Sequence, residues 1–199
     1  MNLETITEAV ARALFVPLEA SGRHVHVTQA QAQVLFGHGL TPKRPLSQPG
    51  QFLAEERLTI CTERGSFENV AVLGPERKEA QVEISWTDAR VLGIKPPVRP
   101  SGAVTNSPGA VLIGPQGQVK LAQGVIVAKR HIHMTPEDAD RHGVKDGQIV
   151  RLQAFTARPV VFEDVQVRVR KDFATYAHLD YDEANACGFS SGDLGRILP

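Results

Sequence analysis

Two short segments with nearly the same residues carry most of the chemistry that this sequence can offer. An Arg-His-Val-His segment occupies residues 23–26, and an Arg-His-Ile-His segment occupies residues 130–133. In an extended strand, side chains two residues apart lie on the same face, so each segment presents two imidazoles side by side. The chain has 7 histidines, and these two segments contain four of them. Because imidazole is a common ligand for transition metals, the pattern predicts metal binding.

Further similarity between the two halves adds one ligand-type residue to each histidine pair. A Phe-Glu-Asn-Val segment at 67–70 and a Phe-Glu-Asp-Val segment at 162–165 are 95 residues apart (162 − 67). The same offset aligns Glu83 with His178, which gives each half three candidate ligands. The histidine segments are 107 residues apart (131 − 24), so an insertion or deletion of 12 residues (107 − 95) separates the matching blocks. Self-similarity on this scale indicates duplication.

The predicted fold class is mainly β with short helices. Many short strand patterns favour paired β-barrels over a doubly wound sheet. We expect two duplicated β-barrel domains related by a pseudo-twofold axis, with the metal site between them. A Pro- and Gly-rich stretch at 95–109 predicts the boundary. The first barrel repeat would then span residues 16–100 and the second 101–199, and exchange of strands between the two is compatible with this division.

The expected elements follow the same scheme in both halves. Strands are predicted at 16–27, 58–61, 70–73, 81–85, 111–113, 119–121, 125–134, 149–154, 160–163 and 165–169. Short helices are predicted at 29–36 after a Thr28 cap, from a Thr87 cap to Gly93, from Thr135 onward, and around Asn185. In the strand at 81–85, alternation directs Val82 and Ile84 to the core and Glu83 to the opposite face.

The first 15 residues form a separate amphipathic segment. Apolar side chains recur at helical spacing, at Leu3, Ile6, Val10, Ala13 and Leu14. This spacing predicts a helix that ends before Pro17. Such a helix can pack on its own domain or on a partner subunit of a homo-oligomer, and the sequence alone leaves both arrangements open.

Composition excludes several classes of function. Lys plus Arg and Asp plus Glu each number 22, and no basic stretch alternates with aromatic residues, which argues against a nucleic-acid partner. No apolar run approaches the roughly 20 residues of a membrane span, and no signal-peptide pattern precedes Glu4. Cys61 and Cys187 lie far apart without a Cys-x-x-Cys motif, which is typical of a reduced, intracellular protein. We therefore expect a metal held by imidazole and carboxylate.

The number of ligands indicates what the metal would do. Five histidines and one glutamate exceed the needs of one tetrahedral structural zinc, and structural sites favour cysteine. Six such ligands suit two metals with open positions, which can hold an anion and polarise a carbonyl group. Cupins and metal-dependent amidohydrolases also use His-x-His. A cupin would have glutamate near residues 29–31, and an amidohydrolase needs a (β/α)8 barrel of about 250 residues, so neither class fits.

Arg77 is the candidate for binding an anion. It stands shortly before Glu83, after a Gly-Pro-Glu segment at 74–76. A guanidinium near a metal is suited to phosphate, because its planar fork matches two oxygens. The alternative is an ordinary solvated surface charge.

Longer motifs make the chain resemble a known family. These motifs lie at residues 21–26, 46–51, 82–85, 92–99, 128–134 and 182–185. In this order they resemble the PduL-type phosphate propanoyltransferases, and the similarity runs from about residue 16 to residue 189. The resemblance implies two zinc ions between two β-barrel domains and an association with bacterial microcompartments. It also implies that acyl-CoA and phosphate are converted into acyl phosphate and free coenzyme A.

The resemblance also implies roles for single residues. It assigns one zinc ion to His24, His26 and Glu83. It assigns the second zinc ion to His131, His133 and His178. Phosphate binding is carried over to Arg77, and contacts with coenzyme A to Ala20, Ser21, Gly22, Arg64 and Asn185.

The sequence departs from the family pattern at three positions. Gly22 replaces the usual asparagine, Ala71 stands where some members have a basic residue, and Trp86 replaces the usual arginine. The ligand set is intact, so these changes concern coenzyme A binding and the preferred acyl group.

These observations together predict a dizinc phosphate acyltransferase that acts on a short-chain acyl-CoA, with propanoyl-CoA as the first substrate to test. The resemblance places it in propanediol degradation in the lumen of a bacterial microcompartment. The N-terminal helix would then be an encapsulation peptide that binds shell or cargo proteins through its apolar face. Two alternatives stay open. One is a dizinc acyl-CoA hydrolase that uses water in place of phosphate, and the other is a non-catalytic, metal-stabilised scaffold protein.

Overall fold

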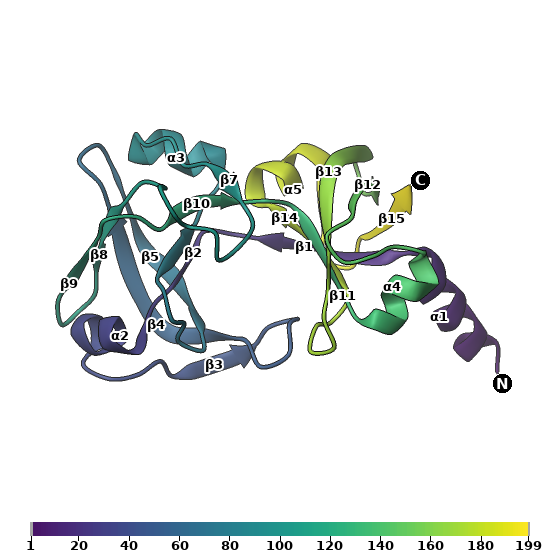
Figure 1. Cartoon of the computed structure of the whole chain (residues 1–199), viewed down its shortest axis with the longest axis horizontal. Coiled ribbons are helices and arrows are strands. Elements are labelled where there is room, and N and C mark those ends of the chain that lie inside the picture. The colour runs from purple at the N-terminus through teal and green to yellow at the C-terminus, as the bar shows by residue number, and fades with distance from the viewer. Residues whose placement is uncertain (1, 199) are drawn as a thin grey trace. The chain divides into compact units, whose positions relative to one another are not determined.

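The computed structural model describes residues 2–198, with the side chains of the N-terminal helix described only in part (Figure 1). The chain divides into two compact units. The barrel unit contains the chain up to Ser21 and again from Arg130 on. The sheet unit contains Gly22–Lys129. Each unit has its own core of buried aliphatic side chains.

The barrel unit is built on a closed six-stranded barrel. Its strands follow the order β1 (Val16–Ser21), β14 (Tyr176–Asp180), β11 (His131–Met134), β13 (Val160–Val169), β12 (Ile149–Phe155) and β15 (Leu194–Leu198). Its helices are α1 (Leu3–Leu14), α4 (Pro136–His142) and α5 (Tyr181–Cys187). Alternation along β11 places Ile132 and Met134, both 0% exposed, in the barrel core. His131 and His133 therefore lie on the outer face of the barrel.

The sheet unit is built on a curled, nine-stranded sheet (Figure 1). Its main path runs β7 (Val98–Arg99), β10 (Val125–Ala128), β6 (Gln81–Glu83), β2 (His24–His26), β5 (Ser66–Gly74), β4 (Phe52–Cys61), β8 (Ala110–Ile113) and β9 (Gln118–Leu121). A further strand, β3 (Pro42–Pro45), pairs with β4, and the helices are α2 (Gln29–Phe36) and α3 (Trp86–Leu92). Val25 and Val82 lie in the core, which turns the candidate ligands to the opposite face.

The predicted fold class, mainly β with short helices and a duplicated plan, is confirmed by strand pairing. In the sheet unit, β2 pairs in parallel with β5 and antiparallel with β6. In the barrel unit, β11 pairs in parallel with β13 and antiparallel with β14. A capped helix follows each of these histidine strands. The two histidine segments therefore occupy equivalent places in two copies of one supersecondary unit.

Backbone conformation repeats with the same offset as the sequence. Asn69 and Asp164, 95 residues apart (164 − 69), both have φ 55°, the left-handed region that non-glycine residues seldom adopt. At each position the pairing with the neighbouring strand shifts register, after Leu58 in one unit and after Val150 in the other. Such a bulge bends its strand and increases the local twist. The duplication thus preserves an irregular feature as well as the regular strands.

The units differ from the sequence halves expected at 16–100 and 101–199. Strand β1 belongs to the barrel formed by the second half, and β8, β9 and β10 belong to the sheet unit. The prediction of two long strands at 16–27 and 125–134 was wrong, because each segment is divided into two strands that belong to different units. Alternating patterns indicate which side chains are buried, but they contain no information about which strand is the hydrogen-bonded neighbour.

The predicted cap of the helix that ends before Gly93 was wrong. The cap of α3 is Ser85 and not Thr87, because the Ser85 side chain accepts from Asp88 N and Asp88 completes the capping box.

The predicted N-terminal helix is present as α1, with Asn2 as its cap. Among its described side chains, Val10 is 51% and Leu14 is 44% exposed. The helix lies beside α4 within the barrel unit (Figure 1).

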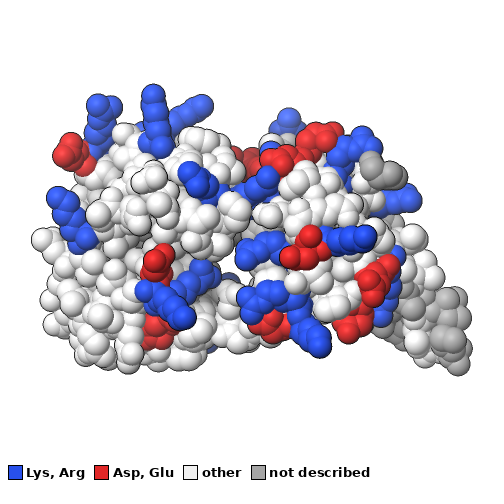
Figure 2. Space-filling view, viewed as in Figure 1, with Lys and Arg blue, Asp and Glu red and all other residues white. Residues whose placement is uncertain are grey.

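The surface in view mixes charges of both signs. Figure 2 shows Lys and Arg side chains interspersed with Asp and Glu side chains, in keeping with 22 residues of each sign in the whole sequence. Among the described residues, no helix is both long and apolar enough to cross a membrane.

Candidate active site

The first group of candidate ligands lies on two neighbouring strands of the sheet unit. His24 and His26 come from β2, and His24 pairs across the antiparallel ladder with Glu83 of β6. His24 Nε2 lies 3.6 Å from one carboxylate oxygen of Glu83, and His26 Nε2 lies 3.9 Å from the other. All three side chains are buried, between 2% and 8% exposed. Strand pairing alone therefore brings together the three residues predicted from the repeat.

Backbone carbonyls orient both imidazoles of this group. His24 Nδ1 lies 2.8 Å from Gly22 O, and His26 Nδ1 lies 3.2 Å from Leu73 O. A carbonyl oxygen can only accept, so in each neutral ring Nδ1 carries the proton and Nε2 keeps its lone pair. The two lone pairs therefore turn toward Glu83, as expected for a metal-binding pair whose outer nitrogens are fixed by hydrogen bonds.

The pKa values of these three buried side chains reflect both their burial and the attraction between the Glu83 carboxylate and the imidazoles. Burial opposes charge on Glu83, but His24 and His26 outweigh burial and hold the pKa of Glu83 well below its usual range. Burial likewise opposes charge on His24, and the Glu83 carboxylate raises the pKa of His24 in spite of it. Burial, followed by the charge of His24, holds the pKa of His26 well below its usual value. The group therefore offers an ionised carboxylate and a neutral imidazole.

Arg77 is connected to this group through Ser101. Arg77 is half-buried in the loop between β5 and β6, where its backbone N donates to Val27 O. Its Nη1 donates to Ser101 Oγ at 3.2 Å, and Ser101 Oγ donates to Glu83 Oε1 at 3.0 Å. Gln81 Nε2 donates to the same carboxylate oxygen. The alternative of an ordinary solvated surface charge therefore does not describe Arg77, which is held beside the candidate ligands.

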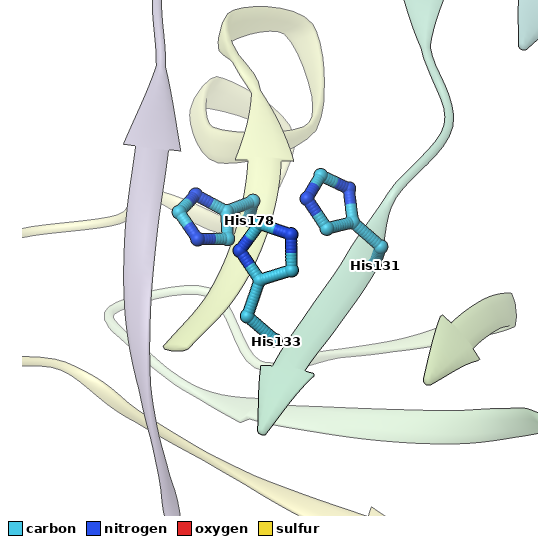
Figure 3. A group of neighbouring side chains, drawn as sticks. All are labelled: His131, His133 and His178. Carbon is cyan, nitrogen blue, oxygen red and sulfur yellow. The ribbon is translucent and has the colours of Figure 1, made fainter. Parts of the chain in front are cut away.

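The second group repeats the first arrangement in the barrel unit with three imidazoles (Figure 3). His131 and His133 come from β11, and His131 pairs across the antiparallel ladder with His178 of β14. The ring centroids lie 4.6 Å apart for His131 and His133, and 5.0 Å apart for His178 and either of them. Figure 3 shows the three rings gathered on one side of these strands.

His133 has the environment of a metal ligand. Both of its ring nitrogens are buried without a hydrogen-bond partner. Burial, followed by the charges of His131 and His178, lowers the pKa of His133 to about 2. The ring is therefore neutral, and at least one nitrogen lone pair would be unsatisfied unless it bound a metal. Glu19 Oε2 lies 3.4 Å from His178 Nδ1.

Both groups fit divalent zinc. In each group the three ligand atoms lie within 4.8 Å of one another. Imidazole nitrogen and carboxylate oxygen are ordinary zinc ligands, and three protein ligands leave a fourth position for water or substrate. The orphaned nitrogens of His133 are the strongest sign of such a ligand role, because native proteins seldom bury polar atoms unsatisfied.

A second arrangement of side chains is also duplicated. In each unit an arginine contacts both an aromatic ring and a carboxylate. Arg23 Cζ lies 4.0 Å above the Phe67 ring, and Arg23 Nη2 lies 2.6 Å from Asp88 Oδ1. In the other unit, Arg130 Cζ lies 5.8 Å above the Phe162 ring, and Arg130 Nε lies 3.3 Å from the Glu183 carboxylate. Each arginine immediately precedes the first histidine of its group. These contacts fix the start of the strand that presents the ligands.

The residues that the resemblance assigns to coenzyme A are distributed over both units. Ala20 and Ser21 end β1, where Ser21 pairs with Asp180, the cap of the helix that carries exposed Asn185. Gly22 begins the sheet unit and accepts the hydrogen bond from His24. Arg64 is exposed in the turn between β4 and β5, beside the end of α3. Their roles in binding coenzyme A stay predictions.

Three further residues contact the candidate ligands but were not predicted from the sequence. Gln81 shares a strand face with Glu83, so the same alternation could have indicated it. Ser101 lies in the stretch interpreted as a boundary, and no sequence pattern brings it to Glu83. The ring of Phe173 stacks on His133 with centroids 4.0 Å apart. That contact comes from a loop and has no local sequence signal.

A duplicated β protein with a group of three potential metal ligands in each unit is the class that the fold and the side chains define. Comparison with known sequences makes this class specific. A family model described as phosphate propanoyltransferase matches residues 17–190. A phosphate propanoyltransferase of Enterococcus faecalis is 54% identical and covers 91% of this chain and 87% of the relative. One from Listeria monocytogenes is 51% identical over 100% of this chain and 97% of the relative.

A third relative gives the same result. The phosphate propanoyltransferase of Thermotoga maritima is 53% identical over 89% of this chain and 86% of its own length. The chain therefore belongs to the phosphate propanoyltransferase family, and it is a transferase.

Proposed function

We propose that this chain transfers the acyl group of a short-chain acyl-CoA, propanoyl-CoA first, to inorganic phosphate in a reaction that uses two zinc ions. The observation that supports this most is the pair of three-ligand groups at equivalent positions of duplicated units, in a member of this family. One ion would be held by His24, His26 and Glu83. The other would be held by His131, His133 and His178.

The reaction requires no protein nucleophile. An oxygen of hydrogen phosphate attacks the thioester carbonyl carbon, a C–O bond forms, and the C–S bond breaks. The sulfur leaves as a thiolate and takes up the proton that the phosphate brought, so the products are acyl phosphate and free coenzyme A. Bound zinc would supply Lewis acidity at an open coordination position, which suits an anion or a carbonyl oxygen.

Arg77 is the residue that we assign to phosphate. Its half-buried guanidinium is anchored by Ser101, so the planar fork is oriented before the substrate arrives. A charge-assisted pair with two phosphate oxygens would fix the attacking oxygen relative to the thioester. Ser101 also contacts Glu83, so the anion site and the first ligand group share one hydrogen-bond network.

Propanoyl-CoA consumption with and without phosphate distinguishes this proposal from its two alternatives. We expect loss of the thioester only with phosphate, with one acyl phosphate formed for each coenzyme A released. Loss without phosphate, giving propanoate, would favour the hydrolase. A zinc-loaded, folded protein that consumes no acyl-CoA under either condition would favour the scaffold protein.

We also propose that α1 directs the enzyme into a microcompartment by binding a shell or cargo protein. Two observations support this. Val10 and Leu14 expose about half of their apolar surface. The match to the family model begins at residue 17, after α1 has ended at Leu14, so the helix lies outside the part of the chain that this model covers.

A further inference from the structure

Arg168 lies on the strand face that carries the second ligand group. In the parallel ladder between β11 and β13, Arg168 is the partner of His133. The preceding residue, Val167, is 0% exposed in the barrel core, so the side chain of Arg168 lies on the outer face with His133. Side chains opposite one another on adjacent strands lie within contact reach. A half-buried guanidinium therefore stands beside the three imidazoles.

The duplication shows that the fold does not require this arginine. The 95-residue offset aligns Arg168 with Leu73 (168 − 73). Leu73 occupies the same place in β5, next to the first group, where its carbonyl oxygen accepts from His26. A leucine thus serves the equivalent position in the other unit. The cation is an addition to the duplicated plan, which points to a role in chemistry.

An aromatic ring and a second arginine complete the surroundings. Phe173 stacks on His133, and Arg168 Cζ lies 5.9 Å from the centroid of the same ring. Arg170 Cζ lies 5.0 Å from it, but Arg170 Nε and Nη2 donate to the Asp172 carboxylate at 2.9 and 2.6 Å. The charge of Arg170 is therefore compensated locally.

The electrostatics of this place favour an anion. The second group has three imidazoles and no carboxylate, whereas the first group includes Glu83. A divalent ion held by three neutral imidazoles would keep its positive charge, of which the Glu19 carboxylate near His178 could offset only part. Excess positive charge in a partly buried site stabilises a negatively charged oxygen of the substrate.

We propose that Arg168 binds a negatively charged oxygen of the substrate beside the second ligand group, and is thus a further catalytic residue. This rests on the proposed function. Two sources supply an oxygen of this kind: inorganic phosphate itself, and the thioester carbonyl oxygen, which becomes negative when phosphate attacks. The chemistry that recognises them is the same, a guanidinium next to an electropositive ligand group.

The test uses the full-length, zinc-loaded enzyme with three variants. Arg168→Leu introduces the residue that the other unit has at this position, so it should fold and keep its zinc. Arg168→Gln removes the charge but keeps a polar side chain of similar reach. Arg170→Leu is the matched control, because it removes a neighbouring arginine whose charge is already compensated. For each protein we would measure zinc content, thermal unfolding, calorimetric binding of inorganic phosphate, and kinetics with propanoyl-CoA.

Arg168→Leu should lower turnover by roughly 100- to 1000-fold, with zinc content unchanged. Weaker calorimetric binding of phosphate and a raised KM for phosphate would identify phosphate as the source. A lower kcat with unchanged phosphate binding would identify the thioester oxygen. Arg170→Leu should stay within about threefold of wild type, the range of a surface change.

Three results would overturn the inference. The first is an Arg168→Leu enzyme as active as wild type. The second is an equal loss in Arg170→Leu. The third is loss of zinc or fold together with activity in both Arg168 variants, since Arg168 would then support the ligand group and not the substrate. A wild-type enzyme without phosphate-dependent turnover would instead refute the proposed function, so the two failures are distinguishable.

Discussion

Arg130 Nε lies 3.3 Å from Glu183 Oε1, at the residue immediately before the first ligand of the second group. The pair repeats the one between Arg23 and Asp88 in the other unit, where the contact is 2.6 Å. Glu183 also belongs to the capping box of α5, because its carboxylate accepts from the backbone N of Asp180. One carboxylate thus links the start of β11 to the start of α5.

The Glu183 carboxylate gives stability a defined pH dependence. Burial, followed by the charge of Asp180, raises the pKa of Glu183 from 4.5 to about 7, in spite of Arg130. Because the folded state binds this proton more tightly than the unfolded chain, its contribution to stability is present below pH 4.5 and is lost as the pH rises to about 7. Glu183→Gln should therefore be more stable than wild type above about pH 7, by at most about 3 kcal/mol.

Denaturant unfolding of both proteins at about pH 5 and about pH 8 measures this difference. The stability advantage of the Glu183→Gln protein over wild type should be clearly smaller at the lower pH. An advantage of equal size at both values would contradict the raised pKa. Any loss of zinc at low pH affects both proteins, so the comparison isolates the glutamate.

Zinc content tests the two ligand groups. We expect about two zinc ions per chain in protein purified without added metal, because each group offers three ligands. His178→Ala should lower this value to about one and lower turnover with it, because two imidazoles hold zinc much less tightly than three. His38→Ala is the matched control, since the His38 side chain is 59% exposed and lies outside both groups. A reproducible value near zero or one in wild type would refute the two-zinc assignment.

The proposed role of α1 predicts a separation of activity from targeting. Removal of residues 1–14 leaves Phe15, whose ring contacts Phe155, and β1 in place. The truncated enzyme should keep its turnover but no longer co-purify with microcompartment shells. Val10→Ser combined with Leu14→Ser should act in the same way, because these exposed side chains supply apolar surface. If truncation unfolds the protein, α1 is a structural element of the barrel unit.

Kinetics of Arg77 variants test the phosphate site. Arg77→Ala should keep zinc and fold but lower turnover by about 30- to 1000-fold, the equivalent of roughly 2–4 kcal/mol for a charge-assisted contact. Arg77→Lys should restore only part of the activity, because an ammonium lacks the planar fork. The defect should appear in the phosphate parameters, with acyl-CoA affinity affected much less. A fully active Arg77→Ala enzyme would move the phosphate site to another cation, with Arg99 or Lys129 the next to test.

The candidate ligands were predictable from the sequence because they depend on local periodicity and on the repeat. Strand alternation places His24 and His26 on one face, and the 95-residue offset identifies Glu83 and His178. The assignment of strands to units was not predictable. Strand-forming residues lie on both sides of Gly22, so the sequence there favours one long strand, although the chain passes from the barrel unit to the sheet unit at this point.

Contacts between distant segments likewise could not be predicted from the sequence. Ser101 reaches Glu83 from a stretch that contains several prolines and glycines, and Phe173 reaches His133 from a loop. Arg168 could have been noticed through its alignment with Leu73, but its position beside His133 depends on the register between β11 and β13. Register is set by the whole sheet, so it has no signature within either strand.

The most direct test of the account follows the oxygen atoms of phosphate. Zinc-loaded enzyme is incubated with propanoyl-CoA and phosphate labelled with oxygen-18 at all four positions, and the products are identified by mass spectrometry. Attack by phosphate on the thioester predicts propanoyl phosphate that retains all four labelled oxygens, formed in equal amount with free coenzyme A. Unlabelled propanoate as the first product, released at the same rate without phosphate, would contradict the account.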